Sequence, residues 1–273
     1  MKAKIGEGDN RRMLSKWIAK HRPLAKWLFI IFPITFFILL DACGAPPWFN
    51  GLFTFCVCLV SFLAPEVACA WVLNKPGKEY QQTGNIEVYM NAIEEVLTYP
   101  NSKVNQQAFL ISYGGMLVEV GETERGLEIL KGIYIDQYNS THSANKYCYY
   151  ANLSWAYEAL GNDGQAEIWY RKSMEIYCHL PQNKYKMALT PSALLSSARR
   201  CYHRGEYGEA QQLLDKITDA PMPTRIHMAF LRGSLALEAG DTEGAKANLQ
   251  YVLTWGSKLY IAKIAQEKLR DLA

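Results

Sequence analysis

Hydrophobic side chains gather near the beginning of this 273-residue chain, in two runs with a short turn between them. The first run, residues 27–40, contains no charged residue. The second extends from Trp48 to Pro65 and continues over residues 67–73, after the single acidic residue Glu66. A membrane-spanning helix needs about 20 apolar residues. With their flanks both runs approach that length, so the pattern predicts a two-helix transmembrane hairpin over residues 27–73.

The segment between the two runs admits a second interpretation. Gly44 and the pair Pro46–Pro47 favour a turn, because proline cannot continue a helix. Leu40 to Cys43, however, resembles a degenerate bacterial lipobox, in which Cys43 would become a lipidated N-terminus. The first run is longer than the apolar core of a signal peptide, and a second apolar run follows directly. We therefore expect the hairpin, with the lipoprotein as the alternative.

Charge is distributed unevenly along the chain. Residues 1–26 carry eight lysines and arginines and two acidic residues, whereas residues 75–273 carry 21 basic and 22 acidic residues. Because basic flanks stay on the cytoplasmic side, we expect a basic cytoplasmic tail over residues 1–26. The expected localisation is an integral protein of the bacterial cytoplasmic membrane, with the folded part in the cytoplasm. That part is nearly neutral, which argues against nucleic-acid binding.

The pattern after the apolar runs is that of amphipathic helices. Residues 74–84 are polar, contain Pro76 and Gly77, and predict a linker. Residues 85–97 have an apolar helical period and stop before Pro100, which predicts a first helix. Four glycines then recur at comparable intervals, where helical hairpins would turn: Gly121, Gly161, Gly205 and Gly240.

The clearest repeat unit is Asn152–Tyr177, which resembles a tetratricopeptide repeat. Leu153, Ser154 and Tyr157 match the large–small–large pattern of that family's first helix, and Gly161 matches its turn. The second helix is matched by Ala166, Tyr170 and Ser173. Three further units carry the same offsets, at Gly114, Gly121, Gly126 and Leu130; at Ala198, Gly205, Ala210 and Leu214; and at Gly233, Gly240, Ala245 and Leu249.

This resemblance implies an all-α fold in which about four helical hairpins stack into an α-solenoid. The expected repeat domain covers residues 85–273, with cap helices at both ends, the last of them capped by Ser257. Two positions depart from the family pattern, since Cys201 stands where tyrosine is preferred and Arg232 where leucine is preferred.

The resemblance also implies where a partner would bind. In tetratricopeptide arrays the first helix of each hairpin lines the concave surface, and the matching positions here mix aromatic and charged side chains. We expect the partner-binding residues to be Trp155, Glu158, Arg199, Tyr202, His203 and Phe230.

The sequence has no phosphate loop, dinucleotide fingerprint, nucleophile elbow or His-Glu-x-x-His motif. The pairs Cys178–His179 and Cys201–His203 lack the paired spacing of zinc ligands. We therefore expect no enzymatic activity, no catalytic residue, no cofactor and no metal site.

The sequence hypothesis is a membrane-anchored scaffold or adaptor that binds a protein or peptide at the cytoplasmic membrane face. Its expected partners are that protein or peptide and membrane lipid through residues 27–73, but no nucleic acid. Three alternatives remain. They are an accessory subunit of a larger membrane or secretion complex, a lipoprotein with an extracytoplasmic repeat domain, and an enzyme or ion pathway centred on Glu66.

Overall fold

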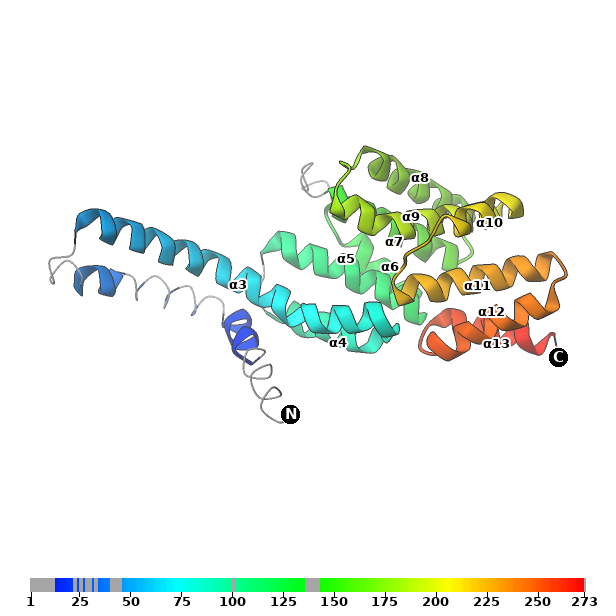
Figure 1. Cartoon of the computed structure of the whole chain (residues 1–273), viewed down its shortest axis with the longest axis horizontal. Coiled ribbons are helices and arrows are strands. Elements are labelled where there is room, and N and C mark those ends of the chain that lie inside the picture. Colours follow the sequence, from blue (N-terminus) through cyan, green and yellow to red (C-terminus); the bar gives the residue numbers. More distant parts are fainter. Residues whose placement is uncertain are drawn as a thin grey trace. The chain divides into compact units, whose positions relative to one another are not determined.

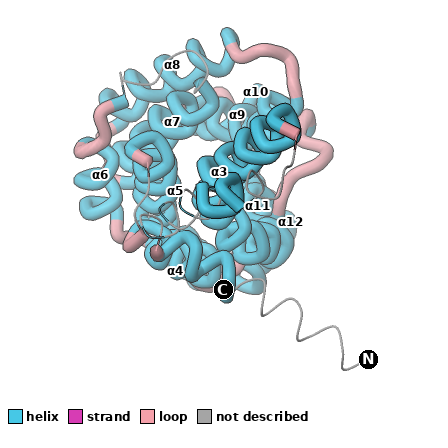
Figure 2. The backbone as a smooth tube through the Cα atoms, turned by 90° about the vertical axis from the view of Figure 1, so that its left-hand side faces the viewer, coloured by secondary structure: helices cyan, strands magenta, loops and turns pink. Residues whose placement is uncertain are grey.

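The structure, a computed structural model, describes residues 13–21, 24, 27, 31, 34–39, 46–99, 102–135 and 143–272. All regular elements in this part of the chain are helices (Figures 1 and 2). The chain divides into two compact units: residues 1–77 with 91–103, and residues 78–90 with 104–273. Cys43 and the first twelve residues of the basic tail lie outside the described residues.

The first unit contains a helical segment at residues 13–20, most of helix α3 (Pro47–Thr83) and the second half of helix α4 (Ile86–Leu97). Lys16 Nζ lies 2.8 Å from Glu95 Oε2, and the Tyr99 hydroxyl donates to the other oxygen of Glu95 at 2.6 Å. One carboxylate thus joins the helical segment at 13–20 to the end of α4. The buried apolar side chains of this unit include Ala68, Cys69, Val72, Ile93 and Val96.

The predicted transmembrane hairpin over residues 27–73 is wrong. Among the described residues, no helix combines the length and the apolar character that crossing a membrane requires. The second apolar run is the beginning of α3, a 37-residue helix that continues without a break into a polar stretch. Ala68, Cys69 and Val72, at the end of that run, are buried inside the protein. The predicted localisation as an integral membrane protein depended on this hairpin and is therefore wrong as well. The expected contact of residues 27–73 with lipid depended on it too.

The structure also differs from the expected linker at residues 74–84. Helix α3 continues to Thr83, and only Gly84 and Asn85 separate it from α4. Val72 and Pro76 are four residues apart on α3, and both are buried. Helix propensity is a weak preference that tertiary packing overrides, so packing on this face explains a helix where Pro76 and Gly77 predicted a linker.

The second unit is an array of helical hairpins. Figure 2 shows that the first helix of each hairpin lies in an inner layer and the second in an outer layer. This architecture confirms the tetratricopeptide-like fold expected from the repeats. The hairpins are α5 (Lys103–Val120) with α6 (Thr123–Lys131), α7 (Ser143–Ala159) with α8 (Asp163–His179), α9 (Lys184–His203) with α10 (Tyr207–Asp215), and α11 (Met222–Glu238) with α12 (Thr242–Trp255).

The four predicted turn glycines close these hairpins. Gly121, Gly161, Gly205 and Gly240 have φ angles of 93°, 71°, 77° and 74°, in the left-handed region that glycine enters without steric cost. A fifth glycine, Gly84, has a φ of 74° and turns α3 into α4. The turn geometry of the repeat is therefore present once more than the sequence predicted.

Small residues allow the two helices of each hairpin to approach closely. A Cβ atom on Gly114 would lie 2.8 Å from Leu130 Cγ, and one on Gly233 would lie 3.0 Å from Leu249 Cγ. In the second hairpin, the Ser154 hydroxyl donates a hydrogen bond of 2.8 Å to the carbonyl oxygen of Ala166, which is fully buried. These contacts support the repeat register.

The final helix α13 (Tyr260–Arg270) covers the end of the array. Ile261, Ala262 and Ala265 are buried on one face of it. Its N-cap residue is Leu259, which makes no side-chain capping bond, so Ser257 does not cap this helix as predicted. The apolar side chain of Leu259 is buried instead, and packing sets the start of the helix.

Candidate functional site

Five of the six predicted binding residues form one chain of contacts on the inner helices α7 and α9. The Arg199 guanidinium carbon lies 4.9 Å from the centroid of the Trp155 ring, and its Nε atom lies 3.8 Å from Glu158. His203 Nε2 lies 3.4 Å from the same Glu158 oxygen, and the His203 ring contacts the Tyr202 ring edge-on at 5.8 Å. The sixth residue, Phe230, lies on the neighbouring inner helix α11 and is partly buried. We call these six residues with Arg200 the inner cluster.

Glu158 is the electrostatic centre of the inner cluster. Arg200, which sequence analysis missed, donates to Glu158 Oε2, and its side chain is only 4% exposed. Burial of Glu158 would raise its pKa, but the charge of Arg199, the hydrogen bond from His203 and the charge of Arg200 outweigh that effect. They lower the pKa of Glu158 to about 2. Glu158 is therefore ionised at neutral pH and engages both guanidinium groups.

Trp155 lies inside the array rather than on an open surface. Its side chain is 8% exposed, and the ring of His227 from α11 meets it edge-on at 4.9 Å. Tyr260, at the start of α13, contacts Trp155 from another direction at 6.4 Å. Residues of α9, α11 and α13 thus all contact this indole. The position predicted to bind a partner instead packs α7 against α11 and α13.

A nearly buried hydrogen-bonded pair lies beside Trp155 and was also missed. His227 Nε2 lies 2.7 Å from Glu119 Oε2 on α5, and both side chains are nearly buried. The burial of Tyr80 at the end of α3, together with the negative charge of Glu119, raises the pKa of that tyrosine. Tyr80 also stacks on Tyr89 of α4, with ring centroids 5.7 Å apart. The α3–α4 turn therefore contributes to the interior of the repeat unit.

The more exposed residues of the inner cluster lie at the end of α9 and midway along α11. The His203 side chain is 38% exposed, and Tyr202 and Phe230 are partly exposed. The Tyr202 hydroxyl donates to Glu238 Oε1 at 3.3 Å, and its ring contacts Tyr207 at 5.5 Å. We call Tyr202, His203 and Phe230 the inner edge.

One group of residues has the spacing of metal ligands within the described part of the chain, namely Cys201, Glu206 and Glu209. Arg204 already occupies this neighbourhood. Its Nη2 atom lies 3.0 Å from Glu206 and donates to the Cys201 sulfur at 3.6 Å. The guanidinium supplies the positive charge that a cation would bring, so this group does not define a metal site.

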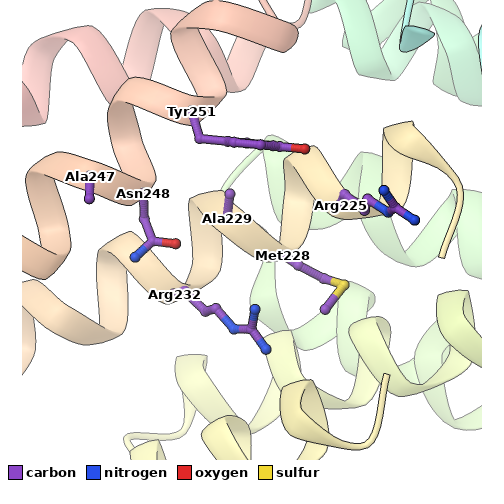
Figure 3. Close-up of a pocket in the computed structure, with 7 residues that line it drawn as sticks. All are labelled: Arg225, Met228, Ala229, Arg232, Ala247, Asn248 and Tyr251. Atoms are coloured by element: carbon purple, nitrogen blue, oxygen red, sulfur yellow. The ribbon is translucent and has the colours of Figure 1, made fainter. Parts of the chain in front are cut away.

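A groove with a volume of about 340 Å³ lies between α11 and α12 (Figure 3). It is separate from the inner cluster. Arg232 donates to Asp215 Oδ1 at 3.2 Å and to the Leu214 carbonyl at 3.5 Å, at the end of α10. The groove is lined by Arg225, Met228, Ala229 and Arg232 from α11, and by Ala247, Asn248 and Tyr251 from α12.

A signal in the sequence pointed to some of the missed contacts. Cys201 and Arg232 are the two departures from the family pattern, and both make polar contacts, Cys201 with Arg204 and Arg232 with Asp215. Arg200 and Glu119 carried no such signal, because a charged residue on an amphipathic helix is ordinarily exposed.

Comparisons with known proteins add little to this geometry. No family model and no curated protein matches the chain. A solved structure described as "Functional Characterization of Pseudomonas Aeruginosa pilF" is similar at 16% identity, with a TM-score of 0.38, over 93% of this chain and 100% of that chain. A likeness at that level carries no argument about fold or function. The assignment to tetratricopeptide-like helical hairpins therefore rests on the turns and helix crossings of this chain.

Proposed function

We propose that the chain is a non-enzymatic helical-repeat scaffold that binds a protein or peptide partner at its inner edge, formed by Tyr202, His203 and Phe230. The proposal rests on a difference in solvent exposure between side chains that contact one another. The Glu158 and Arg200 side chains are 11% and 4% exposed, whereas His203, bound to the same carboxylate, is 38% exposed.

Contacts that hold the side chains of the inner edge in place favour binding. A side chain that is already held in one orientation loses less conformational entropy when a partner docks on it. His203 is held by Glu158, and Tyr202 is held by Glu238 and by the rings on either side of it. Aromatic side chains fixed in this way are typical of binding hot spots.

The charges of the inner cluster bear on the kind of partner. Arg199 and Arg200 both face Glu158, and Arg200 also lies 3.9 Å from Asp163. An acidic peptide would have to compete with these carboxylates for the arginines. The inner edge therefore favours a partner that offers an apolar side chain to Tyr202 and Phe230 and a hydrogen-bonding group to His203.

Site-specific photo-crosslinking tests the proposal. The photoreactive residue p-benzoylphenylalanine would replace Phe230 or Tyr202 in the full chain, and crosslinked proteins would be identified by mass spectrometry. The matched control is Tyr185, an exposed tyrosine at the other end of α9. We expect one recurrent adduct from the inner-edge positions and none from Tyr185. Equal adduct patterns at all three positions would contradict binding at the inner edge.

A further inference from the structure

We propose that the groove between α11 and α12 binds an extended acidic peptide segment, with two carboxylates about 10 Å apart along its backbone and one apolar side chain between them. This site lies outside the inner cluster and shares no residue with the inner edge. The inference adds a second binding surface and does not depend on a partner at the first.

The groove is open because the outer layer is short at this point. Helix α10 has nine residues and ends at Asp215, whereas α8 has 17 and α12 has 14. A loop over residues 216–221 then leads into α11. The side of α11 that carries Arg225 is therefore exposed beyond the end of α10, and α12 forms the other wall (Figure 3).

The lining has positive charge and no carboxylate of its own. Arg225 uses Nε to donate to the Ala220 carbonyl at 2.7 Å, and among the described residues its two terminal nitrogens form no hydrogen bond or ion pair. Arg232 is paired with Asp215, but the two side chains are 37% and 59% exposed. Exposed pairs of this kind contribute little to stability, so a ligand carboxylate can share Arg232 at small cost.

The spacing of the two arginines defines the ligand. Arg225 and Arg232 are seven residues apart on one helix, which corresponds to about 10.5 Å along its axis. Figure 3 shows Met228 and Ala229 between them on α11, with Tyr251 facing from α12. In a polyproline II peptide, side chains three residues apart share one face and lie about 9 Å apart. Two acidic residues at that spacing reach both arginines.

The centre of the groove suits an apolar side chain. Met228 and Ala229 form its floor, and the Tyr251 ring forms one wall while its hydroxyl donates to Met222 Sδ at 3.3 Å. The Asn248 side-chain nitrogen donates to the Gly244 carbonyl at 2.8 Å. Among the described residues the side-chain oxygen of Asn248 has no hydrogen-bond donor, so it can accept from a peptide N–H. A volume of about 340 Å³ accommodates one large side chain with the adjoining backbone.

Fluorescence anisotropy with synthetic peptides tests the inference. The probe is a fluorescein-labelled Gly-Glu-Pro-Leu-Glu-Gly peptide, titrated with the purified full chain. We expect saturable binding that weakens as salt is raised, and at least about tenfold weaker binding to Arg225→Gln/Arg232→Gln. Ala247→Glu leaves both arginines in place and adds a carboxylate to the groove. We expect it to weaken binding as well, by repulsion.

Two controls separate this result from general attraction between a basic surface and an acidic peptide. Arg270→Gln removes one charge from α13, outside the groove, and should leave the affinity within about twofold. The matching peptide with glutamines in place of both glutamates should bind at least about tenfold more weakly. Absence of binding to the wild-type chain at millimolar protein would overturn the inference. Equal affinity of the Ala247→Glu and Arg225→Gln/Arg232→Gln variants and wild type would overturn it too.

Discussion

His227 and Glu119 form a buried pair that joins the fourth hairpin to the first, with Nε2 and Oε2 2.7 Å apart although the two residues are 108 positions apart in the sequence. Their side chains are 7% and 12% exposed. The inner helices α5 and α11 therefore meet inside the array. With Trp155 and Tyr260, this pair forms a set of side chains that pack against one another between the inner helices and α13.

A double-mutant cycle measures how much this pair contributes. Glu119→Gln, His227→Ala and the double variant are compared with wild type by urea unfolding of the full chain. A buried hydrogen bond with a charged partner should give a coupling energy of about 1.5–3 kcal/mol. The pair Arg171–Glu167 is the control, because its separation of 2.8 Å is nearly the same but its arginine is exposed. Its coupling should stay below about 0.5 kcal/mol. Equal coupling in the two cycles would contradict a special role for His227 and Glu119.

The local features of the fold could be predicted from the sequence. Gly161 and Ala166 lie five residues apart. Gly161 permits a left-handed turn and Ala166 permits a close helix crossing, and both can be recognised from a short stretch of sequence. The contacts of the inner cluster could not be predicted in this way. Arg200 and Glu119 resemble solvent-exposed charges, and only their contacts with Glu158 and His227, on other helices, show that they are largely buried.

The membrane prediction failed for a related physical reason. An uncharged run shows that a segment avoids water, but it does not show whether lipid or protein surrounds it. Cys69 and Val72, at the end of the second run, are buried within the protein. Five of the six residues chosen by repeat offset, all but Phe230, form one chain of contacts. Their role in binding stays a prediction.

Overpacking tests the register of the repeats. Ala166 is fully buried, and Ser154 donates to its carbonyl oxygen where α7 crosses α8. Ala166→Leu adds three carbon atoms at this crossing and should lower the unfolding free energy by about 1–3 kcal/mol. The control Ala247→Leu, at an exposed position of α12, should change it by less than about 0.5 kcal/mol. Thermal melting followed by circular dichroism distinguishes the two, and an unchanged midpoint for Ala166→Leu would place that residue on the surface.

The cysteines should differ in reactivity. Burial raises the pKa of Cys148 to about 11 and also raises the pKa of Cys201. Because the thiolate is the reactive form, both thiols should resist alkylation in the native protein at pH 7.5. Cys178 is exposed near the end of α8 and should be modified before Cys148 and Cys201. Brief iodoacetamide treatment followed by peptide mass spectrometry gives the order, and adding urea should remove the difference. Rapid modification of Cys148 in the native state would show that its surroundings open readily.

The stability of the repeat unit should depend on acid through Glu158. Its pKa falls from 4.5 to about 2 on folding, because Arg199, His203 and Arg200 outweigh its burial. A lowered pKa means that the ionised carboxylate stabilises the fold above about pH 4.5, by about 3 kcal/mol, and that this contribution disappears as the pH falls toward 2.

Glu158→Gln removes the contribution of this carboxylate and should destabilise the chain most at pH 6–7. The difference from wild type, measured by urea unfolding at each pH, should narrow steadily below pH 4.5. Glu243→Gln, at a carboxylate that is 89% exposed, is the control and should differ little from wild type throughout. A difference for Glu158→Gln that stays constant down to pH 3 would mean that the arginines do not hold this carboxylate in its charged form.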